Sequence, residues 1–305
     1  MIKLPSGVDI KSLIDNLRIY SWEASETLLY YSQILKDPNN KSNILQNDNT
    51  EDPVTLADLK VNELIIQRIN QKYKNIDWEI LSEENVKIDS KKFNTLSDWI
   101  WVLDPLDGTK DFIQGTTNYA MHLSLNYKQN PYIGFVLIPE KDELWISNGK
   151  KVWCEKRDGT IIKPNLSKNK SLDDMTLVTS KNHNNKTLKK LIQKIKFTQV
   201  IIMGSIGCKI ASIVRGESDL YICLSLPGQS SPKDWDFAAP QAILKAAGGE
   251  ITNLDNKELN YDSNKRENYD QGGIIIASNN QKNHKSICQQ IKQIILKNDI
   301  YPFYS

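Results

Sequence analysis

The chain has 305 residues, 39% of them hydrophobic, which is enough for one large domain or two of ordinary size. Its 39 basic and 37 acidic residues nearly balance, and the lysines are scattered among Asn and Gln, which argues against a dedicated nucleic-acid surface. The four cysteines form no CxxC pair and no uncharged apolar run reaches membrane length, so we predict a soluble cytoplasmic protein without a zinc knuckle or a disulfide framework.

The N-terminal part begins with helical spacing. Apolar residues between positions 9 and 35 recur at intervals of three and four, which predicts an amphipathic helix. Residues 36 to 53 are rich in Asn, Asp and Pro and indicate a polar loop. Helical spacing returns between positions 55 and 73, and this places Asp58 in the first turn of a second helix.

Short buried strands follow these helices. The segments "WEILSEE" and "DWIWVLD" both end in acids, and further short strands are predicted up to about residue 155. A polar stretch at 161 to 174 separates this strand-rich part from a second set of elements. We take this stretch as the junction between an N-terminal lobe, residues 1–160, and a C-terminal lobe, residues 161–305.

Strands and helices alternate in the second lobe. The predicted strands are "MTLVTS", "QVIIMG", "DLYICL" and "GIIIAS", and the predicted helices lie near 186–196, 205–216, 236–247 and 281–297. Such alternation is typical of helices layered on sheets, so the expected fold class is α/β.

Five carboxylates stand at the ends of predicted elements, where a side chain can reach a cleft: Asp58, Glu83, Asp104, Asp107 and Asp236. A single acid of this kind is more often a solvated residue or a helix cap. Asp104 and Asp107 differ because they follow the buried run "WIWVL", with Pro105 restricting the backbone and Gly108 allowing a sharp turn. Two like charges held there repel each other, and a bound divalent cation removes that cost. Carboxylate ligands suit Mg²⁺.

Two other acidic loops are excluded by their spacing. A calcium-binding EF-hand requires a Glu at the twelfth loop position, and counting from Asp104 puts Gly115 there. The haloacid-dehalogenase phosphatases read D-x-D-G-T, with a nucleophilic Asp two residues before the second Asp. Pro105 occupies that place here, so an aspartyl-phosphate route through this loop is excluded.

Four segments carry a family resemblance: "DPVTLAD" at 52–58, "SEE" at 82–84, "DPLDGTKDF" at 104–112 and "DWDFAAPQAILKAAGG" at 234–249. In this order they resemble the lithium-sensitive, Mg²⁺-dependent phosphatase superfamily of inositol monophosphatase and the 3'(2'),5'-bisphosphate nucleotidases. The resemblance covers about residues 50 to 250 and implies a two-lobed αβαβα sugar-phosphatase fold with the active site between the lobes.

The resemblance also implies roles for individual residues. The metal ligands would be Glu83, Asp104, the carbonyl of Leu106, Asp107 and Asp236. Glu83 would also be catalytic, Asp58 would assist a further metal or its water, and Thr109 would hydrogen-bond the attacking water. Two or three Mg²⁺ ions, with Mn²⁺ as an alternative, would activate that water without a covalent intermediate. Asp107 and the exposed amides of Gly108 and Thr109 would contact the phosphate group.

The residues after Thr109 bear on the substrate. Inositol monophosphatases typically continue with a second Thr and Asn, whereas bisphosphate nucleotidases carry Lys, a variable residue and Phe, as Lys110 to Phe112 do here. Lys110 taken alone is equally well explained as a surface base. The position at which inositol enzymes place a Glu is Cys223, which is a poor hydrogen-bond acceptor. An extended loop between 219 and 235 also has the length seen in nucleotidases.

The segment "GSIGCKIA", residues 204–211, resembles the part of the nucleotidases that contacts the nucleotide. Ser205 and Lys209 are therefore candidates for binding a second phosphate or the ribose. The alternative is a plain Ser cap followed by a surface Lys. Nucleotidases of this group commonly have an Arg at the position of Cys223, which is a departure from their pattern.

The predicted function is removal of the 3'-phosphate from adenosine 3',5'-bisphosphate, which yields AMP and clears a by-product of sulfate assimilation. Alternatives are inositol monophosphatase or fructose-1,6-bisphosphatase activity, or a phosphate-binding regulator without turnover, against which Asp58 and Thr109 argue. We expect a monomer or homodimer with no nucleic-acid or membrane partner. His122 alternates with apolar residues in a strand and is interpreted as a structural or surface residue, not a metal ligand.

Overall fold

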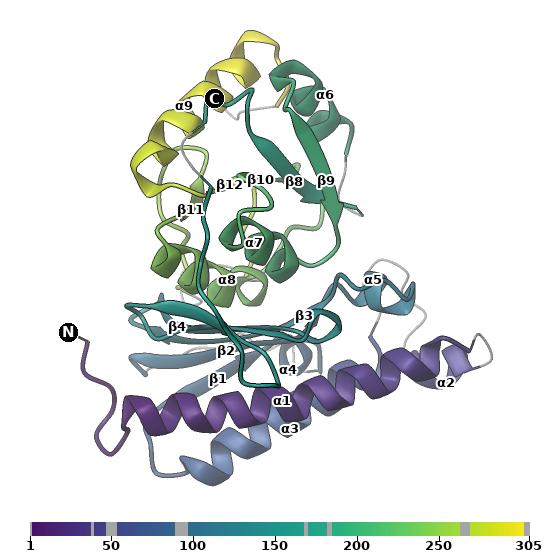
Figure 1. Cartoon of the computed structure of the whole chain (residues 1–305), viewed down its shortest axis with the longest axis vertical. Helices are drawn as coiled ribbons and strands as arrows, with labels where there is room; N and C mark the ends of the chain where they lie inside the picture. Colours follow the sequence, from purple (N-terminus) through teal and green to yellow (C-terminus); the bar gives the residue numbers. More distant parts are fainter. Residues whose placement is uncertain are drawn as a thin grey trace.

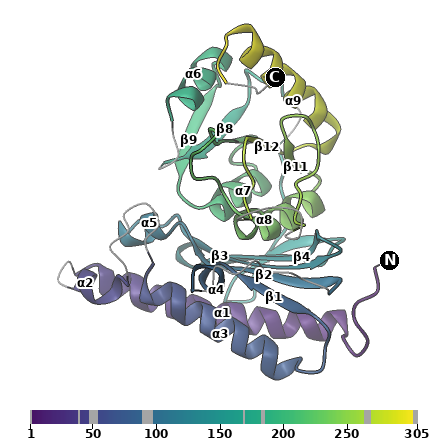
Figure 2. The same ribbon diagram turned by 180° about the vertical axis from the view of Figure 1, so that it is seen from behind.

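The computed structural model describes residues 2–37, 40–46, 54–88, 97–167, 170–181, 185–262 and 269–301. Within these ranges the chain stacks in the order helices, sheet, helices, sheet, helices (Figure 1). This order confirms the expected α/β fold with αβαβα layers. The same stacking is visible from behind in Figure 2.

The first two layers are a helix pair and a seven-stranded sheet. Helices α1 (Ile10–Leu35) and α3 (Leu56–Lys72) cover the outer face of that sheet. Its strands follow the chain order β1 (Glu79–Ser82), β2 (Trp99–Asp107), β3 (Ala120–Tyr127), β4 (Asn130–Ile138), β5 (Glu143–Ser147), β6 (Val152–Glu155) and β7 (Ile161–Ile162). Strands β1 and β2 are parallel and the remaining neighbours are antiparallel.

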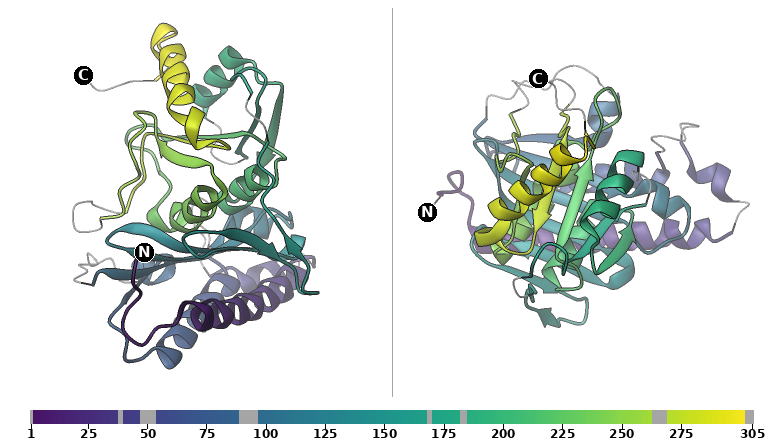
Figure 3. Two further views of the ribbon diagram at one scale, coloured as in Figure 1. Left: turned by 60° about the vertical axis from the view of Figure 1, so that its left-hand side comes forward. Right: turned by 90° about the horizontal axis from the view of Figure 1, so that it is seen from above.

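The upper layers are built around a second sheet. Its strands lie in the order β11 (Glu250–Asn253), β12 (Ile274–Ser278), β10 (Leu220–Leu224), β8 (Thr176–Ser180) and β9 (Gln199–Met203). Helices α7 (Ile206–Val214) and α8 (Asp234–Ala247) lie between the two sheets, and α6 (Lys186–Ile195) and α9 (Gln281–Lys297) cover the outer face (Figure 3). Shorter helices are α2 (Lys41–Ile44), α4 (Glu83–Ile88), α5 (Thr109–Ile113) and the 3₁₀ turn η2 (Pro139–Lys141).

The central hydrophobic core joins the two sheets through α8. One cluster of buried side chains includes Val136 of β4, Phe237 of α8 and Tyr221 of β10. The helix can pack this closely because β4 carries Gly134, where a Cβ atom would lie only 2.8 Å from the carbonyl oxygen of Ala239. Helix α8 is thereby packed directly against the first sheet. The division into lobes at residue 160 stays a prediction.

Most predicted elements are present, with differences in the short ones. The helices predicted at 9–35 and 55–73 are α1 and α3, capped at their N-termini by Asp9 and Thr55. The predicted loop at 36–53 contains α2, and its residues 38–39 and 47–53 lie outside the described part of the chain. In that described part, no helix combines the length and apolarity needed to cross a bilayer. The cytoplasmic location stays a prediction.

Candidate active site

Three predicted acids converge where β2 meets the start of α8. Asp104 and Asp107 lie at the end of β2, where the pairing with β3 is interrupted between them, and Asp236 lies in the first turn of α8. One oxygen from each carboxylate can be chosen so that all three lie within 4.8 Å of one another. The structure therefore brings Asp236 next to two acids that lie more than a hundred positions before it in the sequence.

These carboxylates are held in an environment that disfavours their negative charge. Burial, followed by the charges of Glu83, Asp107 and Asp236, raises the pKa of Asp104 well above its usual value. Burial, followed by the charges of Asp107 and Glu83, also raises the pKa of Asp236 well above its usual value. Since a cation among these oxygens would offset both effects, and since hard oxygen ligands suit divalent ions, the residues fit a metal site.

Glu83 lies near these acids, at the end of the strand next to β2. It is the first residue of α4, directly after β1, which runs parallel to β2. Its carboxylate raises the pKa of Asp104, yet it lies outside the 4.8 Å group. Oε1 of Glu83 instead pairs with Lys87 Nζ at 2.9 Å. Glu83 is thus beside the site with its charge partly neutralised by the lysine one helical turn away.

Asp107 also stabilises the first turn of α7. Its Oδ2 atom accepts hydrogen bonds from Ser205 Oγ at 2.6 Å and from the backbone N–H groups of Ile206 at 2.5 Å and Gly207 at 3.1 Å. Ser205 is the N-cap of α7 and accepts from the Cys208 N–H at 3.2 Å. The alternative that Ser205 is a helix cap is therefore correct, and its contact with substrate stays a prediction.

Asp58 and Thr109 form a hydrogen-bonded pair beside the acids. Asp58 Oδ2 accepts from the N–H and hydroxyl groups of Thr55, and Asp58 Oδ1 accepts from Thr109 Oγ1 at 3.3 Å. Thr109 Oγ1 also lies 3.0 Å from the carbonyl oxygen of Leu106. Burial raises the pKa of Asp58 to about 8. The two residues assigned to water activation are thus in direct contact.

The turn after β2 depends on a glycine. Gly108 has φ of 89°, in the left-handed region, and precedes the short helix α5. A Cβ atom there would lie 3.0 Å from the carbonyl oxygen of Asn118. Lys110 follows in α5 and is half-buried. The predicted contacts of Gly108 and Lys110 with phosphate stay predictions.

Lys209 lies inside the protein. Its side chain is 1% exposed, which rules out a surface lysine at this position. Nζ donates to the carbonyl oxygen of Gly204 at 2.5 Å and lies 5.1 Å from the ring centroid of Tyr221. Burial lowers the pKa of Lys209, and the charges of Asp107, Cys223 and Asp236 oppose that effect. A buried lysine amine therefore stands near the acids.

His122 lies beside the acids, which the interpretation of it as a structural or surface residue did not predict. It is fully buried on β3, and Nε2 lies 3.3 Å from Asp107 Oδ2. Burial lowers the pKa of the imidazole, and the charge of Asp107 opposes that shift. The pairing of β2 with β3 could have predicted this position, because it places His122 opposite Asp104. Spacing along one strand does not contain that information.

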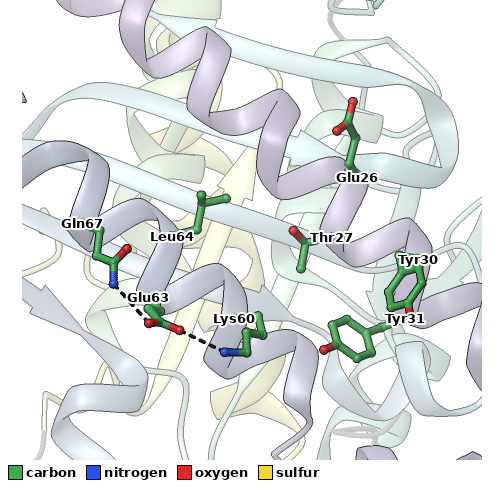
Figure 4. A pocket seen from close by; sticks show the side chains of 8 residues that line it. All are labelled: Glu26, Thr27, Tyr30, Tyr31, Lys60, Glu63, Leu64 and Gln67. Atoms are coloured by element: carbon green, nitrogen blue, oxygen red, sulfur yellow. Dashed lines mark hydrogen bonds and ion pairs between the residues drawn. The ribbon is translucent and has the colours of Figure 1, made fainter.

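A surface groove lies on the far side of the first sheet, between α1 and α3 (Figure 4). It is lined by four residues of α1 and four of α3: Glu26, Thr27, Tyr30, Tyr31, Lys60, Glu63, Leu64 and Gln67. Glu63 bridges Lys60 and Gln67 there, at 3.1 Å to each. None of the predicted site residues is among the residues that line this groove.

Comparisons with known proteins agree with this fold. Residues 17–296 match the inositol monophosphatase family. The 3'(2'),5'-bisphosphate nucleotidase CysQ of Buchnera aphidicola is 31% identical over 233 residues, which cover 76% of this chain and 82% of that protein. The corresponding protein of Aggregatibacter actinomycetemcomitans is 28% identical, covering 74% and 79%.

A solved structure confirms the fold. Inositol monophosphatase II from Staphylococcus aureus superposes with a TM-score of 0.71 at 20% identity and covers 96% of this chain and 100% of its own. At this level of identity the likeness establishes the architecture. The comparisons therefore confirm the resemblance drawn from the four sequence segments.

Proposed function

The chain belongs to the inositol monophosphatase family, and we propose that it is a metal-dependent phosphomonoesterase that hydrolyses adenosine 3',5'-bisphosphate to AMP and phosphate. The observation that carries this proposal is the convergence of Asp104, Asp107 and Asp236 within 4.8 Å at the meeting point of β2 and α8. Four curated relatives, at 24–31% identity, are named 3'(2'),5'-bisphosphate nucleotidases. Their names support the choice of substrate.

We propose two or three Mg²⁺ ions at this site, with Mn²⁺ as an alternative. The three aspartates, Glu83 and the carbonyl oxygen of Leu106 would hold them, and all are hard oxygen ligands. The bound ions would supply Lewis acidity that polarises the phosphoryl group and lowers the pKa of a water molecule. Burial and the neighbouring acids raise the pKa values of Asp104 and Asp236, and bound cations would favour the ionised carboxylates that serve as ligands.

The remaining residues would orient the reactants. Thr109, hydrogen-bonded to Asp58, would direct the attacking water, and Asp58 would hold the threonine hydroxyl in place. The amides of Gly108 and Thr109 would hold phosphate oxygens next to Asp107, much as a helix N-terminus binds anions. Direct attack by water needs no covalent intermediate. The presence of both Asp58 and Thr109 argues against a phosphate-binding regulator without turnover.

Positive charge near the acids favours a substrate with a second phosphate. Lys209, buried beside the start of α7, would supply a point charge to that phosphate, together with Lys110 and the N-terminal region of α7 at Ser205. The carboxylate that inositol recognition uses is replaced by Cys223. Inositol monophosphatase and fructose-1,6-bisphosphatase activities are the alternatives, because nucleotidases commonly carry Arg at that position.

The experiment that tests the substrate is a panel of phosphate esters assayed with Mg²⁺. We expect kcat/KM for adenosine 3',5'-bisphosphate to exceed the values for inositol 1-phosphate, fructose 1,6-bisphosphate and 3'-AMP. Release of phosphate from inositol 1-phosphate but not from the nucleotide would reverse the choice. Lys209→Met keeps the side-chain length and removes the charge, so it should raise KM for the bisphosphate more than KM for 3'-AMP, which lacks the second phosphate.

The proposed activity also implies a partner, an oligomeric state and a location. A small-molecule phosphate ester is the partner, and the enzyme would act as a monomer or homodimer in the cytoplasm, without nucleic-acid or membrane partners. The proposed reaction would remove a by-product of sulfate assimilation. Size-exclusion chromatography with light scattering measures the oligomeric state directly.

A further inference from the structure

His122 occupies the space beside the two acids of β2. Antiparallel pairing of β2 and β3 sets it opposite Asp104, and its side chain is fully buried. Nε2 lies 3.3 Å from Asp107 Oδ2, and Nδ1 lies 4.0 Å from Asp104 Oδ2. The imidazole is therefore in contact with Asp107 and close to Asp104.

The same ring reaches the segment that carries the third acid. Nδ1 of His122 lies 3.3 Å from the carbonyl oxygen of Trp235. Trp235 directly precedes Asp236 in the first turn of α8. One buried side chain thus connects β2 with the start of α8, across 113 positions of the sequence between His122 and Trp235.

A glycine in α7 makes room for the ring. A Cβ atom at Gly207 would lie 2.2 Å from His122 Nε2, a distance at which atoms overlap. The N–H of Gly207 donates to Asp107 Oδ2 at 3.1 Å. The backbone of α7 therefore hydrogen-bonds the carboxylate oxygen that the imidazole contacts from the other side, and Nε2 of His122 makes no hydrogen bond in the described part of the chain.

We propose that His122 is a positioning residue of the metal centre, which fixes Asp107 and the start of α8 at the separation at which the three acids share a cation. The inference rests on the proposed function, since it assumes that these acids bind metal. Carboxylate ligands depend on neighbouring contacts for their orientation, and loss of such a neighbour typically weakens metal affinity or activity about 10- to 100-fold. The role requires both the volume and the ring nitrogens of His122.

The test measures Mn²⁺ binding to the full chain without substrate, from the free-ion signal in electron paramagnetic resonance. His122→Leu keeps much of the volume but removes both ring nitrogens, and should weaken binding about 10- to 100-fold. His122→Gln places an amide near the position of Nε2 and should recover most of the affinity. At saturating metal, KM for the phosphate ester should stay near the wild-type value in both variants.

A second buried histidine provides the matched control. His284 hydrogen-bonds Ser278 and Thr252, at 2.7 Å each, in the layer around α9. His284→Leu should lower thermal stability without changing Mn²⁺ affinity. Gly207→Ala keeps His122 itself but adds a methyl group that would overlap its ring, so it should also weaken Mn²⁺ binding. This variant keeps the proposal testable if His122→Leu does not fold.

The outcomes separate this inference from the proposed function. Mn²⁺ affinities of the His122→Leu and Gly207→Ala proteins equal to the wild-type value would overturn the inference and leave the function intact. If the wild-type protein itself bound no Mn²⁺, the proposed function would fail, and this inference with it.

Discussion

Ser205 donates a hydrogen bond of 2.6 Å to Asp107, across 98 positions of the sequence. The same serine caps α7 by accepting from the Cys208 N–H. One hydroxyl group therefore fixes both the start of a helix between the sheets and a proposed metal ligand at the end of β2. The folding of α7 and the preorganisation of the site are coupled through this contact.

Removing this hydroxyl should affect both stability and metal binding. We expect Ser205→Ala to lower the free energy of unfolding by about 1 kcal/mol, as for other N-cap losses, and to raise the Mg²⁺ concentration for half-maximal activity. Chemical denaturation and a metal titration measure the two effects. Asn185→Ala removes the N-cap of α6 and should cost similar stability with no change in the metal titration. Equal metal titrations for both variants would contradict the coupling.

Asp104→Asn should abolish turnover while leaving the metal-free protein folded. The amide removes a metal ligand and also removes charge from a buried group of acids that repel each other. Metal-free thermal stability should therefore be equal to or above the wild-type value, as measured by calorimetry. Asp98→Asn, an exposed position just before the same strand, is the control and should retain activity. A fully active Asp104→Asn enzyme would refute the ligand role.

Thr109→Ala should lower kcat far more than it raises KM. The hydroxyl, held by Asp58, is assigned to the attacking water and not to ground-state binding of the ester. Thr109→Ser retains the hydroxyl and should recover much of the rate. Steady-state kinetics at saturating Mg²⁺ measures both constants, and an unchanged kcat would contradict the assignment.

The buried His284 should make the stability of the protein sensitive to acid, independently of the metal site. Burial lowers its pKa from 6.5 to about 4, so between these values the unfolded chain binds more protons than the folded one. Stability therefore falls as pH drops from about 6.5 towards about 4, by on the order of 3 kcal/mol from this group. Urea denaturation across that range should show a smaller pH dependence for His284→Leu than for wild type. Equal pH dependence would exclude His284 as the cause.

The proposed metal ligands could be predicted because each follows a recognisable element boundary. Asp104 and Asp107 come after an apolar run that had to be a buried strand, and Asp236 lies at the start of a helical pattern. The contacts among them could not be predicted in this way. Neither the hydrogen bond from Ser205 to Asp107 nor the position of His122 can be predicted without the packing of α7 and β3 on β2.

The long elements were predicted more completely than the short ones. Helices such as α1 bury one face along many turns, so their spacing is visible in the sequence. The short helices α4 and α5 and strand β11 were missed, because four to six residues give too few repeats to define a period. Lys209 shows a further limit, since only the surrounding layers bury a lysine that composition alone would place at the surface.

The most direct measurement is anomalous diffraction from crystals of this protein grown with Mn²⁺. We predict a strong anomalous peak between the carboxylates of Asp104, Asp107 and Asp236, at ligand distances from all three. A map with no such peak, or with these oxygens turned away from one another, would contradict the account.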